Sequence, residues 1–203
     1  MTKLEVMPPT NGTTGSAPQP LPDGMTIEAF KALPWRPMNK CRYLAEQAAA
    51  GTPVPAKTYQ GGCHCGAIAF DVTLQPPLED GHTVIDCSCS ACRRLGYLLV
   101  YPTRDNVVFR NRGGGQKRCG VYQFNLKVQE HLFCKRCGAS LMIDFLERFH
   151  PEFDGYGINV RALRDVDLSK LSIEKTDGAS YIPPFVDTAG QWYEESDVEE
   201  EKE

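Results

Sequence analysis

The chain has 203 residues, of which 41% are apolar and 24% charged, and its formal net charge is −4. This composition excludes a wholly disordered chain and allows one domain with a hydrophobic core. No apolar run approaches the roughly 18–20 residues that cross a bilayer, and the first residues lack the apolar stretch of a secretory signal. We therefore expect an intracellular protein without a membrane partner, in the cytoplasm, with the nucleus as the alternative.

The first quarter of the chain offers little material for a core. Residues 1–24 are rich in Pro, Thr, Gly and Ser, and this composition predicts a disordered segment. Residues 25–56 are expected to form a helical extension, with one short helix over 26–33 and a second over 39–50 that ends at Gly51. At the other end of the chain, residues 191–203 form an acidic tail.

The part between these ends, residues 57–190, consists of short β-type runs separated by turn residues. This pattern predicts a mostly β, antiparallel domain. A run of three glycines at 113–115 indicates a hairpin turn or a flexible loop. The expected strands lie at 67–74, 83–85, 97–101, 107–109, 120–126, 128–133, 140–145, 157–160 and 171–173.

Charge is distributed unevenly along the chain. Ten Lys/Arg and two acids between Arg93 and Arg136 give this stretch a net charge of +8, whereas residues 194–203 carry a net charge of −6. Aromatic residues at 97, 101, 109 and 122 are interleaved with the basic ones, so a surface that attracts nucleic-acid phosphates is an alternative. The whole-chain pI of 5.6 and the lack of a recognised nucleic-acid motif weigh against it.

Nine cysteines are present, and an odd number without an export signal argues against a disulfide framework. Two of them, Cys41 and Cys119, stand apart and are predicted to be small apolar packing residues. The other seven fall into three tight clusters, whose spacing predicts metal binding: Cys63 and Cys65; Cys87, Cys89 and Cys92; Cys134 and Cys137.

The outer clusters have the form of half-sites for a metal. In the C-x-x-C motif at 134–137, two intervening residues form a tight turn that directs both sulfurs to one side. The C-x-C motif at 63–65 requires an extended or bulged backbone, which the flanking glycines permit. Two such pairs would make one closed four-sulfur site, although spacing alone leaves open which clusters share a metal.

The middle cluster differs, because it offers three sulfurs within six residues and no nearby fourth ligand. Three protein ligands and one open position are typical of a catalytic zinc site, where water or a substrate thiolate takes the fourth place. His64 and His131 are lesser candidates for ligands. His82 and His150 are expected at the surface or in loops.

Four segments together closely resemble the glutathione-dependent formaldehyde-activating enzyme and centromere protein V family: GGCHCGA at 61–67, DCSCSACR at 86–93, YQFN at 122–125 and HLFCKRCG at 131–138. The resemblance covers about residues 57–180. It implies an Mss4-like antiparallel β fold with two Zn²⁺ ions per chain. It also implies a structural zinc at Cys63, Cys65, Cys134 and Cys137 and a catalytic zinc at Cys87, Cys89 and Cys92. The sequence departs from the family pattern at Ser88, where many members carry histidine.

The activity that this resemblance implies is the condensation of formaldehyde with glutathione to S-hydroxymethylglutathione, a carbon–sulfur lyase reaction. The partner would then be a small-molecule thiol, and arginines at 93, 94 and 104 could bind its carboxylates. The resemblance does not identify the groups that donate or accept protons. Two alternatives remain: a non-catalytic zinc-binding interaction module with a nucleic-acid or cytoskeletal partner, and a structural zinc scaffold that needs only the closed site.

Overall fold

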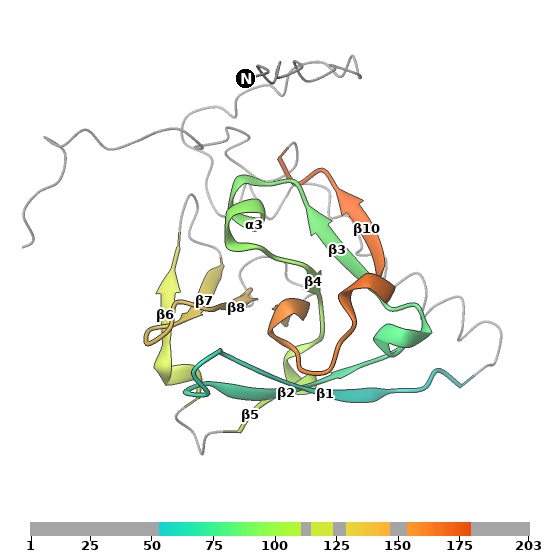
Figure 1. Cartoon of the computed structure of the whole chain (residues 1–203), viewed down its shortest axis with the longest axis horizontal. Helices are drawn as coiled ribbons and strands as arrows, with labels where there is room; N and C mark the ends of the chain where they lie inside the picture. The colour runs from blue at the N-terminus through green and yellow to red at the C-terminus, as the bar shows by residue number, and fades with distance from the viewer. Residues whose placement is uncertain (1–52, 111–114, 124–128, 147–153, 180–203) are drawn as a thin grey trace, which may run out of the picture.

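The computed structural model describes residues 53–110, 115–123, 129–146 and 154–179 (Figure 1). Within these ranges the chain forms ten strands, one α-helix and five short 3-10 turns. None of the helices there is long and apolar enough to cross a bilayer. The helices predicted over 26–33 and 39–50, the two predicted tails, Cys41 and His150 lie outside the described residues.

A small antiparallel sheet is formed by β1 (Lys57–Gly62), β2 (Ala69–Leu74) and β5 (Val107–Phe109), in the order β1-β2-β5. Burial alternates along β2, so that Phe70, Val72 and Leu74 are buried while the residues between them are partly exposed. This period of two gives the small sheet one apolar face.

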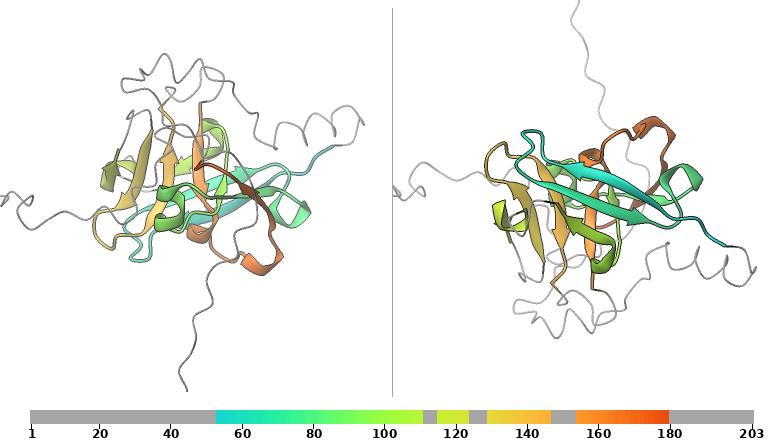
Figure 2. Two further views of the ribbon diagram at one scale, coloured as in Figure 1. Left: turned by 90° about the horizontal axis from the view of Figure 1, so that it is seen from above. Right: turned by 90° about the horizontal axis from the view of Figure 1, so that it is seen from below.

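A second sheet has seven strands in the order β10-β3-β4-β9-β8-β7-β6. Its pairs are antiparallel except for β10 with β3, which run parallel. In Figures 1 and 2 the small sheet lies across the strands of the larger one. The strands of the larger sheet, in chain order, are β3 (Thr83–Cys87), β4 (Leu99–Val100), β6 (Cys119–Tyr122), β7 (Glu130–Cys134), β8 (Ser140–Asp144), β9 (Tyr156–Asn159) and β10 (Ser172–Thr176).

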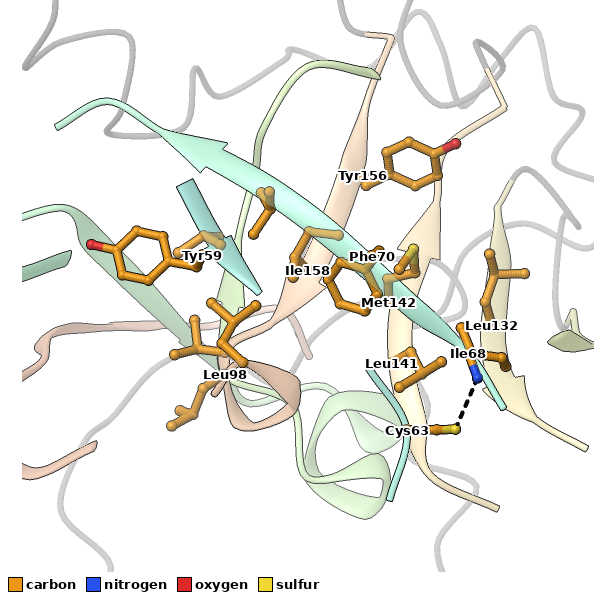
Figure 3. Packing of buried hydrophobic residues seen from close by; sticks show 14 of the residues in the cluster. Tyr59, Cys63, Ile68, Phe70, Leu98, Leu132, Leu141, Met142, Tyr156 and Ile158 are labelled. Atoms are coloured by element: carbon orange, nitrogen blue, oxygen red, sulfur yellow. Dashed lines mark hydrogen bonds between the residues drawn. The ribbon is translucent and has the colours of Figure 1, made fainter. Parts of the chain in front are cut away.

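The main core lies between the two sheets. Phe70 of β2 belongs to the same buried cluster as Met142 of β8 and Ile158 of β9, and all three are fully buried (Figure 3). Each side chain of this size contributes roughly 1.5–3 kcal/mol when it leaves water. The core therefore holds the small sheet firmly against the strands that carry the cysteine-bearing turns.

The prediction of a mostly β fold is confirmed, with some differences in detail. The strand β1 and the helix α3 (Ser90–Leu95) were not predicted, and the strand expected over 97–101 shortens to the two residues of β4. Of the two alternatives predicted for 113–115, the hairpin is wrong, because β5 and β6 belong to different sheets. Of those three glycines, only Gly115 lies in the described residues, where it precedes a 3-10 turn.

His82, predicted at the surface or in a loop, does lie in the loop before β3, but its side chain is buried. Its side chain is 2% exposed, and its ring Nδ1 lies 2.7 Å from the carbonyl oxygen of Pro76. A hydrogen bond of this kind satisfies a buried polar ring, so His82 serves the packing of the connection that follows β2. Cys119 is buried, as its prediction as a packing residue required.

Candidate metal centres

Four sulfurs from the two outer clusters meet in one place, here called the four-sulfur site. Its members are Cys63, Cys65, Cys134 and Cys137, whose Sγ atoms all lie within 4.8 Å of one another. The Sγ atom of Cys65 lies 3.6 Å from that of Cys63 and 3.8 Å from that of Cys134. Sulfurs at the corners of a zinc tetrahedron with bonds of about 2.3 Å are about 3.8 Å apart. The four thiols therefore fit one tetrahedral ion.

The two turns that carry these sulfurs are built alike. Cys63 N donates to Ile68 O at 3.0 Å, and Cys134 N donates to Ala139 O at the same distance. In each turn the residue after the second cysteine is a glycine at positive φ, 74° for Gly66 and 72° for Gly138. This backbone region costs other L-residues roughly 1–2 kcal/mol. The extended or bulged backbone predicted for 63–65 is wrong, because Gly66 N closes a turn by donating to Cys63 O.

The four-sulfur site also joins the two sheets. Its first pair sits between β1 and β2 in the small sheet, and its second pair sits at the β7–β8 turn of the large sheet. Figure 3 marks the hydrogen bond from Ile68 N to Cys63 Sγ, which is 3.2 Å long and orients that sulfur. An ion bound by these four thiols would cross-link two layers that are far apart in sequence.

The middle cluster forms a separate group, here called the three-sulfur site. Cys87 ends β3, Cys89 is the N-cap residue of α3, and Cys92 lies in the first turn of that helix. The backbone N–H of Cys92 donates to Cys89 Sγ at 3.4 Å. The three Sγ atoms lie within 4.8 Å of one another, and no further Cys, His, Asp or Glu from the described residues joins them.

The thiols of the three-sulfur site compete for one negative charge. Hydrogen bonds from Cys87 and then Cys92 lower the pKa of Cys89. The corresponding hydrogen bond to Cys89 raises the pKa of Cys87 to about 11, and hydrogen bonds to Cys87 and Cys89 raise the pKa of Cys92. Three thiolates can therefore coexist here only with a cation between them, which is the chemistry of a thiolate metal site.

Aromatic residues pack around the three-sulfur site. Tyr97 and partly buried Tyr101 belong to the same apolar cluster as Cys87 and Cys92. The Tyr97 hydroxyl lies 3.4 Å from Nδ1 of His131, whose pKa burial lowers to about 4, so this ring is neutral at pH 7. His64 and His131 join neither sulfur group. Of the aromatic residues that the sequence interleaves with basic ones, Tyr97 is buried whereas Tyr122 is exposed.

A groove of about 530 Å³ lies between the four-sulfur site and the C-terminal end of α3. Its lining includes Cys63 on one side and Leu95 and Gly96 on the other. Three basic side chains, His64, Arg161 and Arg164, line it, and none of the described residues in its lining is acidic. Sequence reasoning did not select these two arginines, because only the fold brings the turn after β9 next to α3.

Arg104 is not available for a substrate, so its predicted role is wrong. Its guanidinium donates to Asp144 Oδ1 at 2.7 Å, to Asp154 Oδ1 at 2.7 Å and to the Tyr156 hydroxyl at 2.6 Å. Arg94 is exposed on α3 and donates to Ser90 O at 3.0 Å. Of the arginines predicted to bind carboxylates, those at 93 and 94 remain accessible.

The fold and its cysteines define a class of protein: a two-sheet β protein with one closed and one open thiolate group, each able to hold a metal ion. A family model described as "Glutathione-dependent formaldehyde-activating enzyme" matches residues 58–156, from β1 to the start of β9. This match confirms the resemblance to that family seen in the motifs.

Further similarities to curated proteins and to solved structures include the following. The chain is 29% identical over 93 residues to a Halomonas elongata protein named "Putative glutathione-dependent formaldehyde-activating enzyme", covering 41% of this chain and 54% of that protein. The chain thus spans about half the length of this curated relative. A crystal structure of a Rhodobacter sphaeroides protein has 30% sequence identity and a TM-score of 0.48, covering 58% of this chain and 99% of that one.

Proposed function

We propose that this protein is a zinc-dependent carbon–sulfur lyase of the glutathione-dependent formaldehyde-activating type, with glutathione or a related thiol as substrate. The observation that carries the proposal is the three-sulfur site, where three thiols converge and no fourth ligand from the described residues completes the set. Catalytic zinc sites keep such a position open, whereas structural zinc sites are closed by four protein ligands. The four-sulfur site would hold the structural ion.

The chemistry needs a thiolate at neutral pH. Zinc held by Cys87, Cys89 and Cys92 would lower the pKa of a thiol at its remaining position. The substrate thiol loses its proton, its sulfur forms a bond to the formaldehyde carbon, and the carbonyl π pair moves to oxygen, which takes up a proton. The reverse reaction breaks the same carbon–sulfur bond. The apolar side chains around the sulfurs, including Tyr97 and Ile143, would keep water from this space.

The basic groove supports a substrate with carboxylates. Its three basic side chains, His64, Arg161 and Arg164, face a space that begins at the end of the helix carrying Cys89 and Cys92. Glutathione has two carboxylates, and guanidinium groups bind carboxylates through charge-assisted hydrogen bonds. We place the peptide part of the thiol substrate in this groove.

Replacing both Arg161 and Arg164 by Gln should raise KM for glutathione about tenfold, equivalent to about 1.4 kcal/mol, while the metal content stays unchanged. Steady-state kinetics with glutathione and with 2-mercaptoethanol, which lacks carboxylates, measures the effect. The matched control is Arg136→Gln, an exposed arginine outside the groove. An equal loss with both thiols would contradict a role in carboxylate binding.

The reaction itself is tested by metal content and by exchange kinetics. Purified protein should contain about two zinc ions per chain, because the two sulfur groups are separate. Two-dimensional exchange NMR of glutathione and formaldehyde should show faster interconversion with S-hydroxymethylglutathione when the protein is added. A content of one zinc ion per chain would contradict metal binding at the open site. Two zinc ions per chain without faster interconversion of glutathione and S-hydroxymethylglutathione would rule out formaldehyde as the substrate.

A further inference from the structure

The segment that follows β10 begins beside the three-sulfur site. The strands β10 and β3 run parallel, and their last paired residues are Thr176 and Cys87. Both chains therefore leave the sheet at the same end, and Ser88 N donates to Thr176 O at 2.9 Å. This pairing brings residues 177–179 to the cysteine cluster from 85 or more positions away in the sequence.

The side chain of Ser88 forms hydrogen bonds with residues 177–179. Its hydroxyl donates to Asp177 Oδ1 at 3.0 Å and accepts a hydrogen bond from Ala179 N at 3.3 Å. Ser88 itself lies between Cys87 and Cys89. The two hydrogen bonds thus hold the residues on both sides of Gly178 against the backbone that carries the sulfurs.

Gly178 lies directly against the side chain of Cys87. It is buried, and a Cβ atom built on it would lie 2.2 Å from Cys87 Sγ and 3.3 Å from Cys89 Cβ. Its φ lies outside the left-handed region, so backbone conformation does not require glycine here. The requirement comes from space, because the Cys87 sulfur occupies the position that a larger side chain would need.

We propose that Ser88, Asp177 and Gly178 form a wall of the three-sulfur site. Ser88 and Asp177 are positioning residues: they hold Gly178 against the Cys87 sulfur, which keeps that sulfur in place and closes this flank of the site. A fourth ligand of a metal ion bound there must then approach from another side. Because this flank is closed, the metal ion also leaves the site slowly. The proposal rests on the metal site of the proposed function and is independent of which thiol adduct the protein processes.

Metal release from the full-length protein tests the wall. With Co²⁺ in both sites, an excess of EDTA should remove the ions in two phases, followed through the cobalt–thiolate absorption. Ser88→Ala should speed one phase about tenfold and leave the other unchanged, because both hydrogen bonds of the Ser88 hydroxyl are lost and both lie at one site. Ser88→Thr keeps the hydroxyl and should restore the slow rate. The matched control, Ser172→Ala on the exposed strand β10, should behave as the unaltered protein.

Gly178→Ala gives a second readout. The added methyl must displace the Cys87 sulfur, so the absorption of one of the two Co²⁺ ions should shift or disappear while the other remains. Unchanged rates of metal release in Ser88→Ala would contradict the proposed wall. Equal acceleration of both phases would contradict it as well. Binding of one Co²⁺ by the unaltered chain would overturn the proposed function as well, so the two failures are distinguishable.

Discussion

Replacing Cys134 by Ser is expected to abolish the cooperative unfolding transition of the protein. Cys134 is 1% exposed and its sulfur belongs to the four-sulfur site, which joins the β1–β2 turn to the β7–β8 turn. Metal binding by four thiolates contributes apparent free energies of roughly 10–16 kcal/mol, comparable with the about 5–15 kcal/mol by which whole domains are stable. Near-UV circular dichroism and thermal unfolding measure the loss.

Cys89→Ser should give the opposite outcome, a folded protein that has lost one metal ion and its activity. All three sulfurs of its site lie within residues 87–92, so an ion there closes a very short loop and joins no distant segments. Cys119→Ser is the matched control, because Cys119 pairs with Cys134 across β6 and β7 but belongs to neither sulfur group. If the Cys134 and Cys89 variants behaved alike, the division into closed and open sites would be wrong.

Replacing Arg104 by Met is expected to lower the free energy of unfolding by about 3–5 kcal/mol, the usual effect of leaving a buried charge without its partner. Asp144 is 1% exposed and receives two hydrogen bonds from the Arg104 guanidinium, at 2.7 and 3.2 Å. Gln116 also donates to it at 3.2 Å, but an amide does not neutralise the carboxylate. Urea denaturation at pH 7 measures the change.

The double variant Arg104→Met with Asp144→Asn should lose less stability than Arg104→Met alone, because the buried charge is removed with its partner. The control is Arg110→Met, which breaks an exposed ion pair to Asp71 and should cost about 0–1 kcal/mol. Equal losses in the Arg104 and Arg110 variants would contradict a buried-charge effect.

Sequence patterns located most strands because apolar residues alternate with polar ones where one face of a sheet is buried, as in β2. The helix α3 was missed for a physical reason. It has six residues, and its N-cap is a cysteine sulfur instead of the usual hydroxyl or carboxylate. Arg93 and Arg94 in its last turn and Gly96 at its C-cap were available signals for a helix end.

Each cysteine cluster was predictable by itself, because metal spacing is local within it, whereas the joining of the two outer clusters was implied only by the family resemblance. The surroundings of the sulfurs were not predictable. Gly178 reaches Cys87 only through the parallel pairing of β10 with β3, and Arg161 shares a groove with the end of α3 only through the order of strands in the large sheet. No local pattern encodes such contacts, since they depend on which strands become neighbours.

The position of β10 after both sulfur groups in the sequence bears on how the protein matures during synthesis. A ribosome delivers the three thiols of the open site by residue 92, the last thiol of the closed site at residue 137, and Gly178 only after both. The open site therefore has its three cysteine ligands before the closed site is complete, but it gains Gly178 only after the closed site is complete. A nascent chain presents the three thiols to cellular metal pools, and to wrong metals and oxidants, before β10 and Gly178 have been made.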